Sequence, residues 1–528
     1  MNTPLKSADV AIVGLGPAGA TLANLLGQAG LSVLVFERED DIYPLPRAIH
    51  FDGEVMRIFQ SIGLKDEIDA IARPGLKGMH FVNAENKTLL VRGGTTLKGP
   101  HGCANNYYFH QPLLEQTLRA GLARFNNVFV HQGHEVLDIT QDIDQCLLKV
   151  QVRKGKEGKE GKEDKEDQEF QEVQQYQARY VIGCDGAKSL VRKKIKAQAI
   201  DLGLEQPWLV FDLLLHAELP TLPEHTVQIC DPARPMTYCH VTQKRRRFEI
   251  MLLPGDDRDE LLKPQTLWSL VSKWISPQDA SLERATIYTF HSLIYEKWRD
   301  QRLMILGDSA HQTPPFLGQG MCACIRDASN LAWKLLQVIQ HGAHERLLDT
   351  YETERSPHVH SFIELAVKLG GIIQTTDPKD AQKRDQDLLS NPENVFEFPA
   401  PKLGAGFSVA THPLVNTIFP QPELNNGQLM DEVTKNRFVL ICKSSALLEG
   451  LQGRDSSPHF WKQQPCCTTL LAQDHPHLEQ WLKDKGVDLV FVRPDRYIAA
   501  ATSNPREMMD HLRVLGESLV DEASLDLR

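Results

Sequence analysis

Three glycines near the N-terminus have the spacing of a nucleotide-binding turn. Gly14, Gly16 and Gly19 follow a short apolar run at 10–13 and precede a helical stretch at 20–28. The first glycine permits a tight turn, the second lets the backbone approach a pyrophosphate, and the third lets the helix lie close to the strand. The N-terminus of such a helix offers unpaired N–H groups to phosphates. The chemistry that this spacing predicts is the binding of a dinucleotide.

The elements around the glycines stand in the order that this chemistry needs. A second apolar run, 32–36, ends at Glu37, 18 residues after the third glycine, and its carboxylate can accept both hydroxyls of a ribose. The stretch 10–36 lacks charged residues, as a membrane span would, but Pro17 and repeated glycines interrupt it. We therefore predict a strand, a tight turn, a buried helix and a second strand, and no membrane span. No second fingerprint of this kind occurs, which indicates one tightly bound nucleotide.

Two later motifs also follow apolar strands. Asp185-Gly186 comes after the run 178–183, and Gly307-Asp308 comes after 302–306. A loop rich in proline and glycine, 314–321, leads into a long helix with an apolar face, which we expect to start near Ile325. Three separate segments thus carry residues suited to holding one ligand.

Composition and charge exclude several classes of protein. The chain has 528 residues, 41% hydrophobic and 24% charged, and a net charge of −11, so we expect two or three well-cored domains and no nucleic-acid partner. Its ten cysteines show neither a zinc-ligand spacing nor a disulfide framework, which favours the reducing cytoplasm and predicts no metal site. A run at 153–169 holds six basic and seven acidic residues, and we expect a disordered, solvated hairpin loop that tolerates deletion rather than an interaction tail.

The motifs together resemble a known family. Gly14-x-Gly16-x-x-Gly19, Pro46-Arg47-Ala48, Asp185-Gly186 and Gly307-Asp308 stand in the order found in single-component FAD-dependent aromatic hydroxylases, the class A flavoprotein monooxygenases. The resemblance covers about residues 8–370 and is closer to 3-(3-hydroxyphenyl)propionate hydroxylases. Further matching stretches are 230–235, 247–249, 318–320, 326–335 and 493–500.

The resemblance implies an α/β fold of the para-hydroxybenzoate hydroxylase type. It predicts a Rossmann-type FAD-binding domain at 1–200 and 292–380, with an inserted β-sheet substrate domain at 201–291. A linker at 381–402 would lead to a thioredoxin-like α/β domain at 403–528. Because that last domain has no Cys-x-x-Cys, we expect it to be structural or oligomeric, and a homodimer is one expectation.

The resemblance also names the cofactor and its site residues. The cofactor would be FAD, with NADH or NADPH as co-substrate. The residues expected to bind the cofactor are Gly14, Gly16, Pro17, Ala18, Gly19, Glu37, Arg38, Arg47, Gln111, Asp185, Gly307, Asp308, Pro315, Gly318, Gly320 and Met321. The backbone of 318–321 and the dipole of the following helix would face the edge of the flavin that becomes anionic on reduction.

Catalytic residues are not identified by the sequence, and the substrate-binding candidates are open. His50 or His110 could contact the substrate, and an arginine could pair with a substrate carboxylate; the arginines considered are Arg234, Arg245, Arg246 and Arg247. Cys322 and Cys324 stand where many relatives carry Asn and Gly, so the pocket beside the flavin can differ from theirs.

The expected activity is hydroxylation of a phenolic acid with NAD(P)H and O₂. By resemblance the substrate is 3-(3-hydroxyphenyl)propionate or 3-hydroxycinnamate, converted to the catechol in aromatic catabolism. Two alternatives stay open. One keeps the flavin chemistry on another phenol or a polycyclic natural-product ring, and the other is a flavin-binding protein without turnover.

Overall fold

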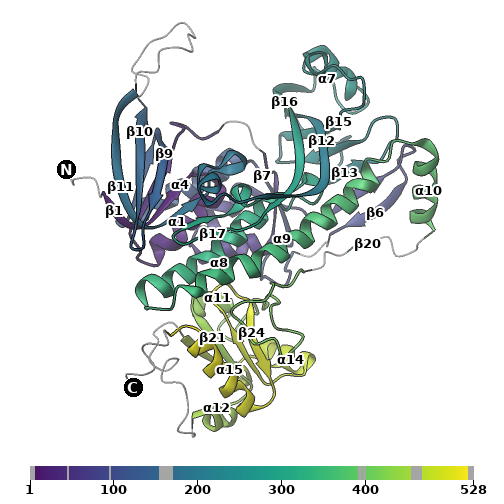
Figure 1. Ribbon diagram of the computed structural model, residues 1–528. Coiled ribbons are helices and arrows are strands. Elements are labelled where there is room, and N and C mark those ends of the chain that lie inside the picture. Colours follow the sequence, from purple (N-terminus) through teal and green to yellow (C-terminus); the bar gives the residue numbers. More distant parts are fainter. Residues whose placement is uncertain are drawn as a thin grey trace.

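The computed structural model describes residues 6–43, 47–93, 97–153, 170–390, 395–396, 400–452 and 467–520 (Figure 1). Pro46 lies outside these residues. So does the charged run at 153–169 apart from the backbone of Arg153, and its expected disorder stays a prediction.

The first large sheet is mainly parallel and contains the predicted nucleotide-binding strands. Its described strands, eight in number, run in the order β17 (Arg299–Asp300), β18 (Leu303–Ile305), β11 (Phe170–Gly183), β1 (Ser7–Val13), β2 (Val33–Glu37) and β8 (Val128–Gln132), and the antiparallel strands β10 (Cys146–Arg153) and β9 (His134–Gln141) extend from β11. Helix α1 (Pro17–Gln28) joins the parallel neighbours β1 and β2. The predicted strand, turn, helix and strand at 10–36 are therefore confirmed.

The second large sheet crosses domain boundaries expected from the sequence. Its order is β19 (His311–Gln312), β16 (Ala280–Tyr295), β12 (Ala199–Leu215), β15 (Arg245–Met251), β14 (Met236–His240), β13 (Thr226–Ile229), β5 (Met79–Val82), β6 (Thr88–Arg92) and β20 (Val395–Phe396). Strands β5 and β6 thus join the sheet expected at 201–291, and β13 pairs with β5 in parallel. Strand β14 is not anticipated from the sequence, because four of its five residues are buried and no period of two appears.

A small sheet and two long helices connect the layers. The small sheet has the order β3 (His50–Asp52), β7 (Asn106–Phe109) and β4 (Ala72–Pro74). Figure 1 shows α8 (Gly320–Gln340) and α9 (Arg346–Ile373) running between the two large sheets and the C-terminal unit. The other helices are α2 (Gly53–Ser61), α3 (Lys65–Asp69), α4 (Gln111–Gly121), α5 (Leu190–Ile195), α6 (Arg258–Leu261), α7 (Pro264–Leu270) and α10 (Pro378–Leu389).

Helix α10 occupies the first part of the stretch expected to be a linker, 381–402. Asp377 accepts hydrogen bonds from the backbone of Lys379 and Asp380, and Pro378 takes the first helical position, so the helix start is well capped. The stretch therefore begins as a helix.

The C-terminal unit has its own mixed sheet. The order is β22 (Cys467–Leu471), β21 (Phe438–Cys442), β23 (Leu489–Val492) and β24 (Ile498–Thr502), with one parallel and two antiparallel pairs. Its helices are α11 (Met430–Thr434), α12 (Ser445–Gln452), α14 (Pro476–Lys485) and α15 (Pro505–Glu517). Trp333 of α8 contacts both Phe407 and Phe438 edge-on, so the unit packs directly on α8. The thioredoxin-like assignment stays a prediction.

Candidate active site

The glycine turn after β1 has two positions where a side chain would collide with the backbone and one position where it would not. A Cβ at Gly14, where φ is +100°, would lie 2.4 Å from the Cys184 carbonyl oxygen, and one at Gly19 would lie 2.0 Å from the Gly14 carbonyl oxygen. At Gly16, no atom of the described residues other than its own and those of its two chain neighbours lies within 4 Å of an added Cβ. The first and third glycines are thus required by packing, while the second leaves space over the backbone.

That space lies at the N-terminus of α1. Gly16 is the residue before the helix, Pro17 fills its first position, and Ala18 follows in its first turn, which carries no acidic side chain. The N–H groups of this turn and the positive end of the helix dipole are available to an anion. The residues present therefore fit the pyrophosphate of a dinucleotide.

Glu37 ends β2 beside this turn. Its two carboxylate oxygens accept hydrogen bonds from the backbone N–H groups of Leu15, at 2.8 Å, and Glu39, at 2.9 Å. Each oxygen keeps a further lone pair, so the carboxylate can still accept ribose hydroxyls. Arg38 is largely exposed and pairs with Glu39 at 3.0 Å.

The three predicted motifs meet at one place. The Gly14 turn rests on Cys184, next to Asp185, and a Cβ on Gly307 would lie 3.5 Å from the Ala18 Cβ. Asp185 accepts hydrogen bonds from the N–H of Leu190 and from the Ser309 hydroxyl, at 2.6 and 3.0 Å. Asp185 thereby fastens the start of α5 to the segment after Gly307.

Arg47, Gln111 and Asp308 form one edge of the same region. The Gln111 side-chain oxygen accepts hydrogen bonds from the backbone of Arg47 and Ala48, at 2.9 and 2.7 Å. The Arg47 guanidinium lies 3.8 Å from the Asp308 carboxylate, and both side chains are half exposed. Gln111 thus positions the Arg47 segment by its backbone, while the Arg47 and Asp308 side chains stay accessible to a ligand.

Helix α8 begins earlier than the sequence predicts. Its first residue is Gly320, not a residue near Ile325, so Gly320 and Met321 lie in the first turn, and the turn Pro315–Leu317 ends at Gly318. The expected start is wrong because glycine is a poor helix former, while packing and the preceding turn decide the boundary here.

Gly318 is held against His50. Its φ is +62°, and a Cβ there would lie 2.9 Å from the His50 Nδ1 atom. The His50 ring contacts the Gly318 carbonyl at 3.3 Å and the Asn106 side-chain oxygen at 2.9 Å. Burial lowers the pKa of His50, and it lowers the pKa of His110 to about 4, so both rings are neutral at pH 7. Of these two histidines, His50 lies at the Gly318 loop, whereas His110 is the residue before α4.

The two unusual cysteines are buried thiols in the first turns of α8. The sulfur of Cys322 contacts the Gly318 carbonyl at 3.6 Å, and that of Cys324 contacts the Gly320 carbonyl at 3.1 Å. Burial raises the pKa of both thiols, so they are protonated and donate to backbone carbonyls.

The four candidate arginines for a substrate carboxylate are engaged within the fold. Arg234 pairs with Asp256 at 2.5 Å, Arg245 with Glu283 at 2.9 Å, and Arg247 with Asp212 at 2.8 Å. Arg246 is buried and donates to backbone carbonyls. Arg247 also donates to the Arg47 carbonyl at 2.9 Å, which makes it a support for the Arg47 segment.

Sequence reasoning missed a buried polar cluster behind the α8 N-terminus. Arg326 donates to Glu54 at 2.6 Å, to Gln319 at 3.0 Å and to Asp52 at 2.5 Å. The signal that could have found it is a charged pair, Arg326-Asp327, on the buried side of an otherwise apolar helix.

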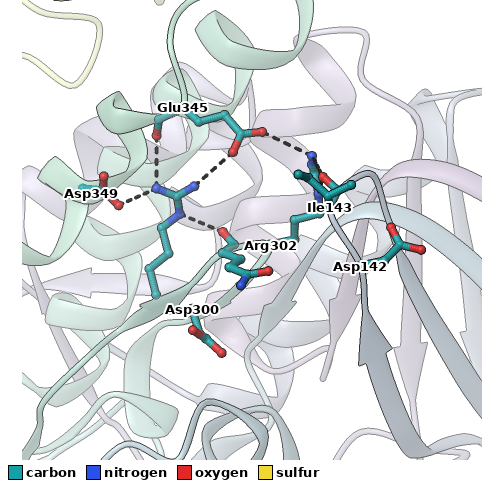
Figure 2. A pocket seen from close by; sticks show the side chains of 8 residues that line it. Asp142, Ile143, Asp300, Arg302, Glu345 and Asp349 are labelled. Carbon is teal, nitrogen blue, oxygen red and sulfur yellow. Dashed lines mark hydrogen bonds and ion pairs between the residues drawn. The ribbon is translucent and has the colours of Figure 1, made fainter.

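A polar pocket lies elsewhere in the fold. It has a volume of about 530 Å³ and is lined by Asp142, Ile143, Arg299, Asp300, Gln301, Arg302, Glu345 and Asp349. Figure 2 shows Glu345 facing Arg302, and Glu345 also pairs with Arg299, so the opposite charges satisfy one another. The described residues include no cluster of three side chains able to hold a metal, and none of their helices has the length and apolar character to cross a membrane.

Comparison with known proteins decides the family. The model of a family described as FAD binding domain matches residues 7–366. The chain belongs to this FAD-binding family. A second model, the HcaD C-terminal domain, matches residues 416–515. The predicted cofactor, FAD, is confirmed.

Similar proteins extend the comparison over nearly the whole chain. A "Probable NADH-specific resorcinol 4-hydroxylase" of Rhodococcus jostii (strain RHA1) is 35% identical over 464 residues, which cover 85% of this chain and 82% of that protein. A "3-(3-hydroxy-phenyl)propionate/3-hydroxycinnamic acid hydroxylase" of Escherichia coli (strain SMS-3-5 / SECEC) is 31% identical over 531 residues, covering 94% and 92%.

Solved structures have the same fold. The flavin-dependent monooxygenase PieE, in complex with FAD and substrate, matches with a TM-score of 0.78 at 18% identity, covering 98% of this chain and 100% of that one. Aklavinone-11 hydroxylase, with FAD and aklavinone, matches with a TM-score of 0.77 at 19% identity and the same coverage. The predicted α/β fold of the para-hydroxybenzoate hydroxylase type is confirmed.

Proposed function

We propose that this member of the FAD-binding family is an aromatic hydroxylase that uses NAD(P)H and O₂ on a phenolic substrate. The observation that carries the proposal is the convergence of three distant motifs on one cradle, in which Gly16, alone among the three glycines of the turn after β1, leaves space over the backbone. The match of the FAD-binding family over 7–366 and the two hydroxylases that share more than 30% of their residues with this chain support it.

We assign the cradle residues to the cofactor by region. The first turn of α1 would hold the pyrophosphate, and Glu37 the adenosine ribose. Arg47 and Asp308, half exposed and 3.8 Å apart, would meet the middle of the cofactor. The full set proposed to bind FAD is Gly14, Gly16, Pro17, Ala18, Gly19, Glu37, Arg38, Arg47, Gln111, Asp185, Gly307, Asp308, Pro315, Gly318, Gly320 and Met321.

The N-terminus of α8 supplies electrostatics for the reaction. FAD, when bound, accepts a hydride from the nicotinamide and activates O₂, of which one atom enters the phenol ring and the other leaves as water. Backbone N–H groups at Gly320 and Met321 and the α8 dipole can stabilise negative charge on the flavin edge. Neutral His50 contacts the Gly318 carbonyl and keeps this loop in place.

The substrate class follows from the relatives and from the engaged arginines. The Escherichia coli relative supports 3-(3-hydroxyphenyl)propionate or 3-hydroxycinnamate as substrate. A second candidate is resorcinol, supported by the Rhodococcus relative. Arg234, Arg245 and Arg247 all pair with acidic side chains of the fold, which favours the uncharged ring of resorcinol. The name of the Rhodococcus relative supports NADH as the nicotinamide co-substrate.

Several wider expectations remain proposals. The described cysteines are free thiols, which suits the cytoplasm. A thioredoxin-like C-terminal domain without redox activity, the domain bounds given above with β5 and β6 added to the β-sheet domain and α10 at the start of the linker, and a homodimer are likewise proposed. Light scattering on the purified chain tests the last of these.

The function is tested by NADH oxidation with and without each phenol. A hydroxylase shows oxidation stimulated by its substrate, a hydroxylated product by mass spectrometry and little H₂O₂. The panel consists of 3-(3-hydroxyphenyl)propionate, 3-hydroxycinnamate and resorcinol. Bound FAD with no response to a broad panel of phenols would instead support a flavin-binding protein without turnover.

A further inference from the structure

Buried ion pairs connect the C-terminal unit to the rest of the chain. Glu354 of α9 accepts two hydrogen bonds from Arg493, at 2.7 and 2.8 Å, and one from Lys334 at 2.7 Å. Arg57 of α2 donates to Asp431, at 2.6 Å, and Asp431 also pairs with Arg496 at 3.0 Å. All of these side chains are almost fully buried, so the two parts are joined by fixed geometry rather than by a loose contact.

The turn that carries Arg493 and Arg496 also places Tyr497. Arg493 donates its backbone N–H to the Tyr497 carbonyl at 2.9 Å, and Arg496 has a left-handed backbone with φ of +72°. Tyr497 is 4% exposed, and its hydroxyl donates to a carboxylate oxygen of Glu54 at 3.1 Å. A residue of the C-terminal unit is thereby brought to helix α2.

From Glu54 the contacts continue to the loop proposed to face the flavin. The other Glu54 oxygen accepts a hydrogen bond from Arg326, and Arg326 donates to Gln319 and Asp52. Gln319 lies between Gly318 and Gly320, directly before α8. Asp52 precedes α2 and accepts a hydrogen bond from the Val55 N–H at 3.1 Å. One guanidinium thus fixes the starts of two helices.

We propose that Tyr497 is a positioning residue for the flavin-facing loop. It orients Glu54, Glu54 orients Arg326, and Arg326 holds Gln319 and hence the N–H groups at the start of α8. The C-terminal unit would then contribute to coupling NADH oxidation to hydroxylation, without touching FAD or substrate. This inference rests on the proposed function and assigns a role to a part of the chain that the cradle does not use.

The role of Tyr497 is tested by removing its hydroxyl group. Tyr497→Phe keeps the ring, and Tyr180→Phe is its matched control, because Tyr180 is also buried and donates to a glutamate, Glu345, at 2.6 Å, in the remote polar pocket. The readouts are the visible spectrum of bound FAD, its dissociation constant, and the amount of product formed per NADH, with H₂O₂ measured in parallel.

Tyr497→Phe is expected to shift the flavin spectrum and to lower the product formed per H₂O₂ by about three- to tenfold, the scale of one ordinary hydrogen bond. Tyr180→Phe should match the wild type in both. Glu54→Gln, which removes the charge between Tyr497 and Arg326, should reduce coupling further; if it does not fold, Tyr497→Phe decides alone.

A Tyr497→Phe variant with wild-type spectrum and coupling would overturn the inference. So would equal changes in both tyrosine variants, since these would reflect a general loss of stability. If the wild type itself binds no FAD or hydroxylates no phenol, the proposed function fails first and this inference falls with it.

Discussion

Arg47 and Asp308 come from opposite ends of the FAD-binding region, yet the guanidinium and carboxylate lie 3.8 Å apart. Their side chains are 57% and 44% exposed, so neither is needed to fill the core. Gln111 holds the Arg47 backbone from one side, and Arg247 holds its carbonyl from the other. The fold therefore fixes the backbone here and leaves the two charged groups for a ligand.

Asp308→Ala should lose FAD without losing the fold. Because Asp308 is half exposed, its removal should change the free energy of unfolding by less than about 0.5 kcal/mol. The ratio of flavin to protein absorbance in the purified variant measures the loss. Asp300→Ala is the control, since Asp300 pairs with Lys297 and lines the remote pocket. Full FAD retention in Asp308→Ala would count against the assignment of Asp308.

The two kinds of glycine in the turn predict opposite phenotypes. Gly16→Ala adds a methyl group into open space at a φ of −70°, so the melting temperature of the FAD-free protein should stay unchanged while FAD affinity falls at least about tenfold through loss of the close approach. Gly19→Ala collides with the Gly14 carbonyl and should cost about 1–3 kcal/mol of stability. Thermal unfolding and FAD titration of both variants separate the effects. An equal loss of stability in both would contradict the open cradle.

Stability should fall in acid because of Glu354. Burial alone would raise the pKa of Glu354, but Arg493 and Lys334 lower it to about 2, from an ordinary value of 4.5. A carboxyl whose pKa is lower in the folded chain stabilises it fully above pH 4.5, and this contribution is lost as the pH falls toward 2.

Glu354→Gln should therefore cost about 3–5 kcal/mol at pH 7 and flatten the pH dependence in that window. Glu364→Gln, on the same helix but exposed, is the control. Urea unfolding at several pH values measures both. A Glu354 variant as stable as the control at pH 7 would show that the buried pair is not needed.

The charged run should be dispensable. Arg153 at the end of β10 pairs in register with Phe170 at the start of β11, so the two strand ends are adjacent. Replacing 154–169 with a two-residue Asn-Gly turn should leave FAD content and melting temperature unchanged. A loss of activity with the fold intact would point instead to the interaction tail.

Local sequence patterns predict the elements around the glycine turn correctly. The glycine turn, both flanking strands and Glu37 are readable because their chemistry depends on neighbours in sequence. Start positions were less readable: α8 begins at Gly320 because the turn at 315–317 and tertiary packing outweigh the low helix propensity of glycine.

Contacts between distant segments could not be derived from those patterns. Nothing local to Glu354 indicates that Arg493 will meet it, and the partners of Tyr497 lie in α2 and α9. The candidate arginines show the same limit. From the sequence, Arg247 is a candidate to bind a substrate carboxylate, but in the fold it pairs with Asp212 on the neighbouring strand.

The central claim is most directly tested by the fate of NADH in the purified, FAD-loaded chain. We expect slow oxidation alone, and faster oxidation with a phenol from the panel that yields about one hydroxylated product per NADH and little peroxide. A colourless protein that takes up no added FAD, or a yellow one that forms only H₂O₂ with every phenol, would contradict the account.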